Sequence, residues 1–171
     1  MEKSTSHQRI EAIAAGFLDV GKYSAFVDFN AFLRTNKLEK SKTGRTGLGT
    51  WSIAYKGKKI GHFCFGQDTW SIDCFDLFPR TDWFAQCEPY LTDALKAFVL
   101  AHINTTSSCC VRSTCHSVEN KIILGKMHSC RVCACRPVMI VDPDGKSLEY
   151  TKALVLIGKH IIGEMSVGCN R

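Results

Sequence analysis

The chain has 171 residues, a length typical of one domain, and it carries a net charge of +6 at pH 7. Hydrophobic residues make up 45% of the chain and charged residues 22%, proportions that exclude an intrinsically disordered or a fibrous protein. A chain of this length buries about 70% of the surface that its unfolded form exposes, so it can form a core without disulfide bonds.

The N-terminal residues do not form a secretory signal, because charged side chains interrupt every apolar run between Glu2 and Asp19. The longest apolar runs, such as ALVLIG from Ala153, are far shorter than the ~18 residues that indicate a membrane-spanning helix. We therefore expect a cytoplasmic protein with no membrane association, whose thiols stay reduced. Ten cysteines in that compartment argue against a disulfide framework.

Two helices are predicted in the N-terminal part of the chain. The first runs from 8 to 20 and ends at Gly21, and its apolar face consists of Ile10, Ile13, Ala14, Phe17 and Leu18. The second runs from Ser24, as its N-cap, to Thr35, and its apolar face consists of Phe26, Phe29, Phe32 and Leu33. The segment KLEKSKTGRTGLG that follows is basic and rich in glycine, which predicts a loop.

Residues 50 to 75 are predicted to form a three-stranded antiparallel meander. The sequences TWSIAY and TWSIDC begin at Thr50 and Thr69, and in both of them large apolar residues alternate with small or polar ones. KGKK supplies the first turn and IGHFCF the middle strand. Four side chains are expected on the core side: Trp51, Ile53, Trp70 and Ile72. An aromatic platform for a flat ligand is the alternative use of the two tryptophans.

The C-terminal part of the chain alternates further strands with helices. A helix is predicted from Thr92 to Asn104, a short strand at KIILG, a buried strand at PVMIV and a turn at DPDG. The last helix is predicted from Ser147 to Met165, with an apolar stripe formed by Tyr150, Leu154, Ile157, Ile161 and Met165.

Strands and helices in separate runs indicate an α+β fold. We expect a three-stranded antiparallel meander packed with helices, followed by a cysteine-rich metal-binding insertion, a further strand or hairpin and a C-terminal helix. Residues 1–171 are expected to form one domain, in which 109–135 is the cysteine-rich subregion.

Six of the ten cysteines lie within this subregion: Cys109, Cys110, Cys115, Cys130, Cys133 and Cys135. Two groups of cysteines separated by a short segment of chain are typical of a tetrahedral zinc site, because tight turns direct their thiolates to one metal ion. Basic residues between the cysteines favour the deprotonated thiolate. We predict a structural zinc site, because the cluster has enough sulfur to occupy all four positions around the metal.

The spacing indicates Cys115 and Cys133 as ligands and leaves the other two positions open. The candidates for those positions are Cys109 or Cys110, Cys130 or Cys135, and the imidazoles of His116 and His128. An iron–sulfur cluster is an alternative, although the spacing matches neither of the common ferredoxin patterns. The remaining cysteines, Cys64, Cys74, Cys87 and Cys169, are expected to be buried thiols without a chemical role.

These observations predict a binding or interaction module with a structural zinc site and an unidentified protein or small-molecule ligand. No group of side chains indicates a catalytic site, so the sequence leaves open whether the protein is an enzyme. A thiol-based redox enzyme or sensor that uses the same clustered cysteines, for example Cys130 and Cys133 as a dithiol, is the first alternative. Nucleic-acid binding through the segment 34–59 is the second, because this segment has eight basic residues and one acidic residue, a net charge of +7.

Overall fold

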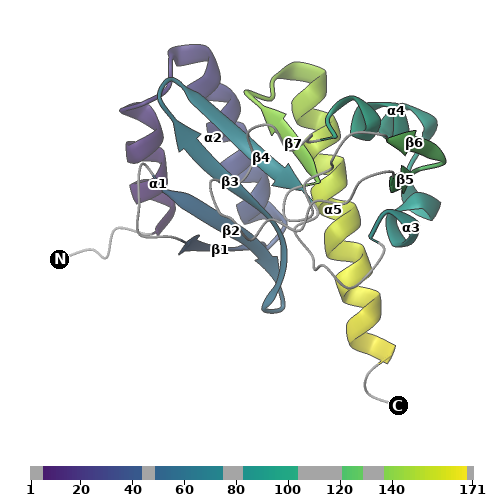
Figure 1. The fold of residues 1–171 in the computed structure, drawn as a ribbon. Helices are drawn as coiled ribbons and strands as arrows, with labels where there is room; N and C mark the ends of the chain where they lie inside the picture. The colour runs from purple at the N-terminus through teal and green to yellow at the C-terminus, as the bar shows by residue number, and fades with distance from the viewer. Residues whose placement is uncertain (1–5, 44–48, 75–82, 104–120, 129–136, 169–171) are drawn as a thin grey trace, which may run out of the picture.

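The computed structural model describes residues 6–43, 49–74, 83–103, 121–128 and 137–168. Its elements in chain order are α1 (Ser6–Ala15), α2 (Val20–Thr35), β1 (Glu39–Thr43), β2 (Thr50–Tyr55), β3 (Lys58–Gly66), β4 (Thr69–Cys74), α3 (Trp83–Cys87), a 3₁₀ helix (Glu88–Tyr90), α4 (Asp93–Ala101), β5 (Lys121–Ile123), β6 (Lys126–His128), β7 (Val138–Val141) and α5 (Gly145–Gly168). The predicted α+β class is confirmed (Figure 1).

The main sheet has five antiparallel strands in the order β1-β2-β3-β4-β7. Its centre is the predicted meander of β2, β3 and β4, which is confirmed, and β1 and β7 are added at the two edges. The turn between β2 and β3 consists of Lys56 and Gly57, which both have positive φ. This pair of backbone conformations matches the right-handed twist of the flanking strands, so it supports a two-residue hairpin.

The core lies between the sheet and the helices α2 and α5, which cover the same face (Figure 1). Phe26 of α2 is fully buried, and its ring centroid lies 4.8–5.7 Å from those of Phe63, Phe65 and Trp70. The four side chains that the sequence assigned to the core are at most 4% exposed: Trp51, Ile53, Trp70 and Ile72. The predicted orientation of the meander is therefore confirmed, and the tryptophans serve as core side chains.

The long helix α5 approaches the sheet closely at Gly158. A Cβ atom at this position would lie 2.8 Å from the side chain of Ile60 in β3, so glycine permits the close contact. Ile60 lies at a β-bulge, because Ile53 pairs with Gly61 and Ala54 pairs with Lys59. The helix continues beyond this contact toward its C-terminus, past the end of β2, where Tyr55 lies.

Several sequence predictions about individual elements are wrong. The first helix, α1, ends at Ala15 and not at residue 20, so Phe17 and Leu18 lie beyond it. Asp19 begins α2, because its side chain accepts a hydrogen bond from the Lys22 backbone N–H at 2.9 Å, and Gly21 and Ser24 therefore lie inside the helix. The predicted loop contains β1, since the edge of β2 offers backbone hydrogen bonds that outweigh the low strand propensity of EKSKT. Met165 is 49% exposed, which removes it from the predicted apolar stripe.

The helix predicted from Thr92 to Asn104 corresponds to α4, which Thr92 caps by accepting a hydrogen bond from the Leu95 N–H. The short helix α3 and the 3₁₀ helix were not predicted. Among the helices that the structure describes, none has both the length and the apolar character needed to cross a membrane.

Candidate functional site

The cysteine-rich subregion contains a short hairpin formed by β5 and β6. The strand predicted at KIILG is confirmed as β5, and β6 is its unpredicted partner. Leu124 and Gly125 connect the strands with φ values of 48° and 76°, the conformation of a tight two-residue turn. Lys121 pairs with His128, so the chain enters and leaves the hairpin at the same end.

All six predicted metal ligands lie outside the described residues: Cys109, Cys110, Cys115, Cys130, Cys133 and Cys135. His116 also lies outside them, whereas His128 is the last residue of β6. Within the described ranges, no group of three or more His, Cys, Asp or Glu side chains is placed to hold a metal ion. The zinc site therefore stays a prediction.

His128 has an unusual environment for a polar side chain. Its Nε2 atom is buried and has no hydrogen-bond partner among the described residues. A buried polar atom without a partner costs about 1–3 kcal/mol, so most such atoms in folded proteins are satisfied by a bond to another group. A neutral imidazole nitrogen is also a common zinc ligand. His128 is thus the described side chain of the subregion whose chemistry fits a metal.

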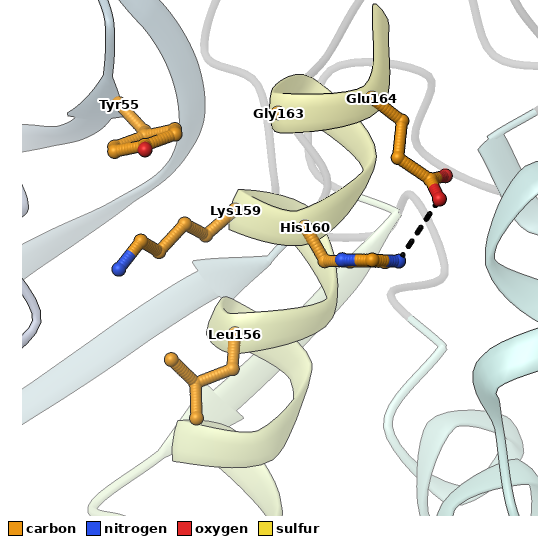
Figure 2. Close-up of a pocket in the computed structure, with 6 residues that line it drawn as sticks. All are labelled: Tyr55, Leu156, Lys159, His160, Gly163 and Glu164. Carbon is orange, nitrogen blue, oxygen red and sulfur yellow. Dashed lines mark ion pairs between the residues drawn. The ribbon is translucent and has the colours of Figure 1, made fainter.

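A second feature is an open hollow between α5 and the end of β2, which we call the α5 hollow. It has a volume of about 380 Å³ and is lined by Tyr55, Leu156, Lys159, His160, Gly163 and Glu164. Figure 2 shows Lys159 extending from the helix toward the side on which Tyr55 lies. A Cβ atom at Gly163 would meet no heavy atom within 4 Å, so this glycine leaves the hollow open.

The tyrosine side of the α5 hollow is positively charged. Lys159 Nζ lies 5.2 Å from the centroid of the Tyr55 ring, and Lys56 Nζ lies 5.5 Å from the same centroid. Lys159 also donates a hydrogen bond of 2.9 Å to the backbone carbonyl of Asn36, at the C-terminal end of α2. Helix C-termini carry a partial negative charge that attracts cations, so this contact fixes the position of the ammonium group.

The opposite side of the hollow carries a carboxylate with two polar partners. Glu164 forms an ion pair with His160, with 3.2 Å between Oε1 and Nε2 (Figure 2). The Tyr90 hydroxyl donates a hydrogen bond of 2.8 Å to the other oxygen of Glu164. This hydrogen bond raises the pKa of Tyr90 above its usual range, because it stabilises the protonated phenol beside a negative charge.

A row of polar side chains crosses the sheet on the face opposite Trp51 and Phe63. Its members pair across neighbouring strands: Ser41, Ser52, His62 and Asp73. Ser52 and His62 are 7% and 8% exposed, and Asp73 is fully buried. Serine, histidine and aspartate occur together in hydrolases, where the histidine bonds to the serine hydroxyl. Among the described contacts, Ser52 Oγ instead lies 2.6 Å from Ser41 Oγ, so the row does not meet that requirement.

The four cysteines outside the cluster were predicted to be buried thiols, and this is confirmed for two of them. Cys74 and Cys87 are each 1% exposed, and burial raises the pKa of both thiols far above the usual range. Cys64 is half-buried, with its sulfur 3.0 Å from Ser71 Oγ, and Cys169 lies outside the described residues. Cys74 and Cys87 are therefore poor nucleophiles in the folded protein.

The basic segment 34–59 is divided over the end of α2, the strand β1 and the turn between β2 and β3. Lys40 is partly buried and donates a hydrogen bond to Asn30, which is fully buried in α2. Lys56 and Lys58 are exposed on the turn, beside the α5 hollow. These contacts assign different environments to lysines that the sequence grouped together, and nucleic-acid binding stays a prediction.

Comparison of the chain with protein-family models, with curated proteins and with solved structures gave no match. The sequence reasoning missed the α5 hollow, because Tyr55 and Lys159 belong to distant segments that only the fold brings together. The spacing of His160 and Glu164, which are neighbours on one helix face, was the signal that the sequence offered.

Proposed function

We propose that the chain is an α+β binding module in which a structural zinc ion holds the cysteine-rich subregion together. The observation that carries this proposal is the buried, unpartnered Nε2 of His128, at the end of a hairpin that separates the two cysteine groups. A zinc ion bonded to this nitrogen would remove the cost of leaving it unsatisfied.

The path of the chain supports a shared metal ion. Residues that face each other in an antiparallel ladder have Cα atoms about 4.5–5.5 Å apart, and Lys121 faces His128 in this way. Cys130 follows His128 by two positions and Cys115 precedes Lys121 by six. Because one residue spans at most about 3.6 Å, the connecting segments are long enough for both cysteines to reach one point near the open end of the hairpin.

The proposed ligand set is three thiolates and one imidazole. Cys115 and Cys133 remain the thiolates that the spacing favours, and His128 takes one of the positions that the spacing left open. The third thiolate comes from the four other clustered cysteines: Cys109, Cys110, Cys130 and Cys135. Four protein ligands leave no position for water, so the zinc in this proposal stabilises the fold and does not take part in catalysis.

Metal retention in the full-length chain tests this proposal. We expect the C115S, C133S and H128A variants to lose zinc at a chelator concentration that leaves the wild-type protein loaded, because each variant removes one ligand. The matched controls are C64S and H102A. Cys64 lies in the main sheet, and His102 Nδ1 already has a 2.8 Å contact with the Phe98 carbonyl oxygen.

Replacement of the zinc by Co²⁺ adds a spectroscopic measurement, because the absorption of tetrahedral Co²⁺ depends on how many thiolates bind it. The wild-type spectrum should indicate three sulfur ligands and one nitrogen ligand, and it should change in H128A. A spectrum that is identical in the wild type and H128A would contradict the role of His128. Protein with no metal and readily oxidised thiols would instead favour the redox alternative.

A further inference from the structure

We propose that the α5 hollow binds a small organic anion, a carboxylate or phosphate group attached to an apolar ring. The hollow places an aromatic ring, an aliphatic side chain and the Lys159 ammonium group around one open space, and Lys56 lies near the same aromatic ring outside the lining. This inference goes beyond the proposed zinc site and does not depend on it, because every side chain that carries it lies in α5 or at the end of β2.

The charge of the hollow favours an anion. Two other lysines of the fold have carboxylate partners. Lys152, also on α5, lies 2.8 Å from Asp28 and 2.7 Å from Glu149. Lys22 lies within 3.6 Å of three aspartates. In contrast, no described carboxylate forms an ion pair with Lys159 or Lys56, and their nearest aromatic contact is the Tyr55 ring. These two ammonium groups therefore retain the capacity to pair with a bound anion.

The carboxylate of the hollow lies away from the proposed anion position. Glu164 contacts His160 and accepts the hydrogen bond of Tyr90 on the side of the hollow opposite Tyr55. An anion on the tyrosine side would meet Lys159, whose ammonium is positioned by the Asn36 carbonyl. A positioned group loses less entropy when it binds than a freely rotating one.

The apolar residues that line the hollow indicate that the ligand also has an apolar part. Leu156 is 39% exposed on α5, and the Tyr55 ring lies across the hollow from the helix. Gly163 keeps the space above them free. The volume of about 380 Å³ is at the lower end of the range of small-molecule sites, about 300–1,000 Å³, which suits a single ring with one anionic group.

An NMR titration of the full-length chain as purified tests this proposal, with phenyl phosphate and benzoate as the probes. We expect saturable shifts of the amides at residues 55–56 and 156–164, and no saturable shifts with benzyl alcohol, which has the ring without the charge. Inorganic phosphate should bind at least about tenfold more weakly than phenyl phosphate, because it lacks the ring that contacts Leu156 and Tyr55.

The variant K159Q should weaken phenyl phosphate binding by about tenfold, the effect of losing one charge-assisted hydrogen bond. The matched control is K152Q on the same helix, which should bind the probe as the wild type does. Equal binding by K159Q and the wild type, or shifts located outside the hollow, would overturn the proposal. Equal binding of inorganic phosphate and phenyl phosphate would overturn the part of it that requires a ring.

Discussion

The five-stranded sheet and the β5–β6 hairpin differ in what can stabilise them. The sheet buries aromatic rings from β2, β3 and β4 against α2. In the hairpin, by contrast, Ile123 is the one fully buried side chain among the residues whose burial is described, and Ile122 and Met127 are 62% and 58% exposed. Isolated two-stranded hairpins are marginal in water. Hydrophobic burial therefore accounts for the sheet, whereas the hairpin has one buried anchor, Ile123, and the proposed zinc ion would add a second.

The largest effect is expected in the sheet core. F26A removes a fully buried ring that contacts Phe63, Phe65 and Trp70, and it should lower the free energy of unfolding by about 3–5 kcal/mol. The control is V20A on the same helix, where Val20 is 87% exposed, and this change should stay within about 0.5 kcal/mol of the wild type. Denaturant unfolding measures both. A similar loss in the two variants would contradict the proposed role of the aromatic core.

A smaller, local effect is expected in the hairpin. I123A removes its fully buried side chain and should cost about 2 kcal/mol, the lower end of the range for such changes, because a short hairpin can relax around the cavity. Hydrogen exchange of the hairpin amides should become faster by about 30-fold, while the amides of β3 should change less. The matched control is I122A, the neighbouring isoleucine, which is 62% exposed. Equal acceleration in both variants would show that burial of Ile123 does not hold the hairpin.

A third effect, a pH dependence, is expected at the edge strand β1. Burial lowers the pKa of Lys40 to about 8, and the nearby Arg34 adds to the shift while Glu11 opposes it. The unfolded chain keeps this proton up to about pH 10.4, so between these values the unfolded state binds more protons and the contribution of Lys40 to stability rises with pH.

The K40M variant measures this contribution. Its free energy of unfolding, compared with that of the wild type, should be most favourable below pH 8. That relative advantage should shrink as the pH rises from about 8 to about 10.4, because the wild type is relieved of its buried charge over this range. Because the comparison is a difference between two proteins, the titration of other groups cancels to first order. A difference that stays constant over the range would contradict the depressed pKa of Lys40.

The parts of the fold that could be predicted from the sequence are those in which local pattern and burial agree. Trp51 and Ile53 alternate with small residues, so the strand and its core face followed directly from the sequence. The strand β1 could not be predicted in this way, because EKSKT gains its structure from the edge of β2. Asp19 caps α2 through a side-chain contact that competes with the stop signal of Gly21.

The candidate sites also differ in whether they depend on a local sequence pattern or on long-range contacts. The clustered cysteines are visible in the sequence because they lie close together along the chain. The α5 hollow depends on Gly158, which permits α5 to approach β3, and on the turn that places Lys56 next to Tyr55. Such long-range contacts leave no periodic signal, so the sequence showed the cysteine cluster and missed the hollow.

The zinc content of the untreated protein tests the central claim most directly. The full-length chain should be purified without chelators or added metal and measured by elemental analysis, together with a count of the thiols that react with an alkylating reagent. The account predicts about one zinc ion per chain and an increase in reactive thiols when a chelator removes it. Protein that contains no zinc, with the same reactive thiols before and after chelation, would contradict the account.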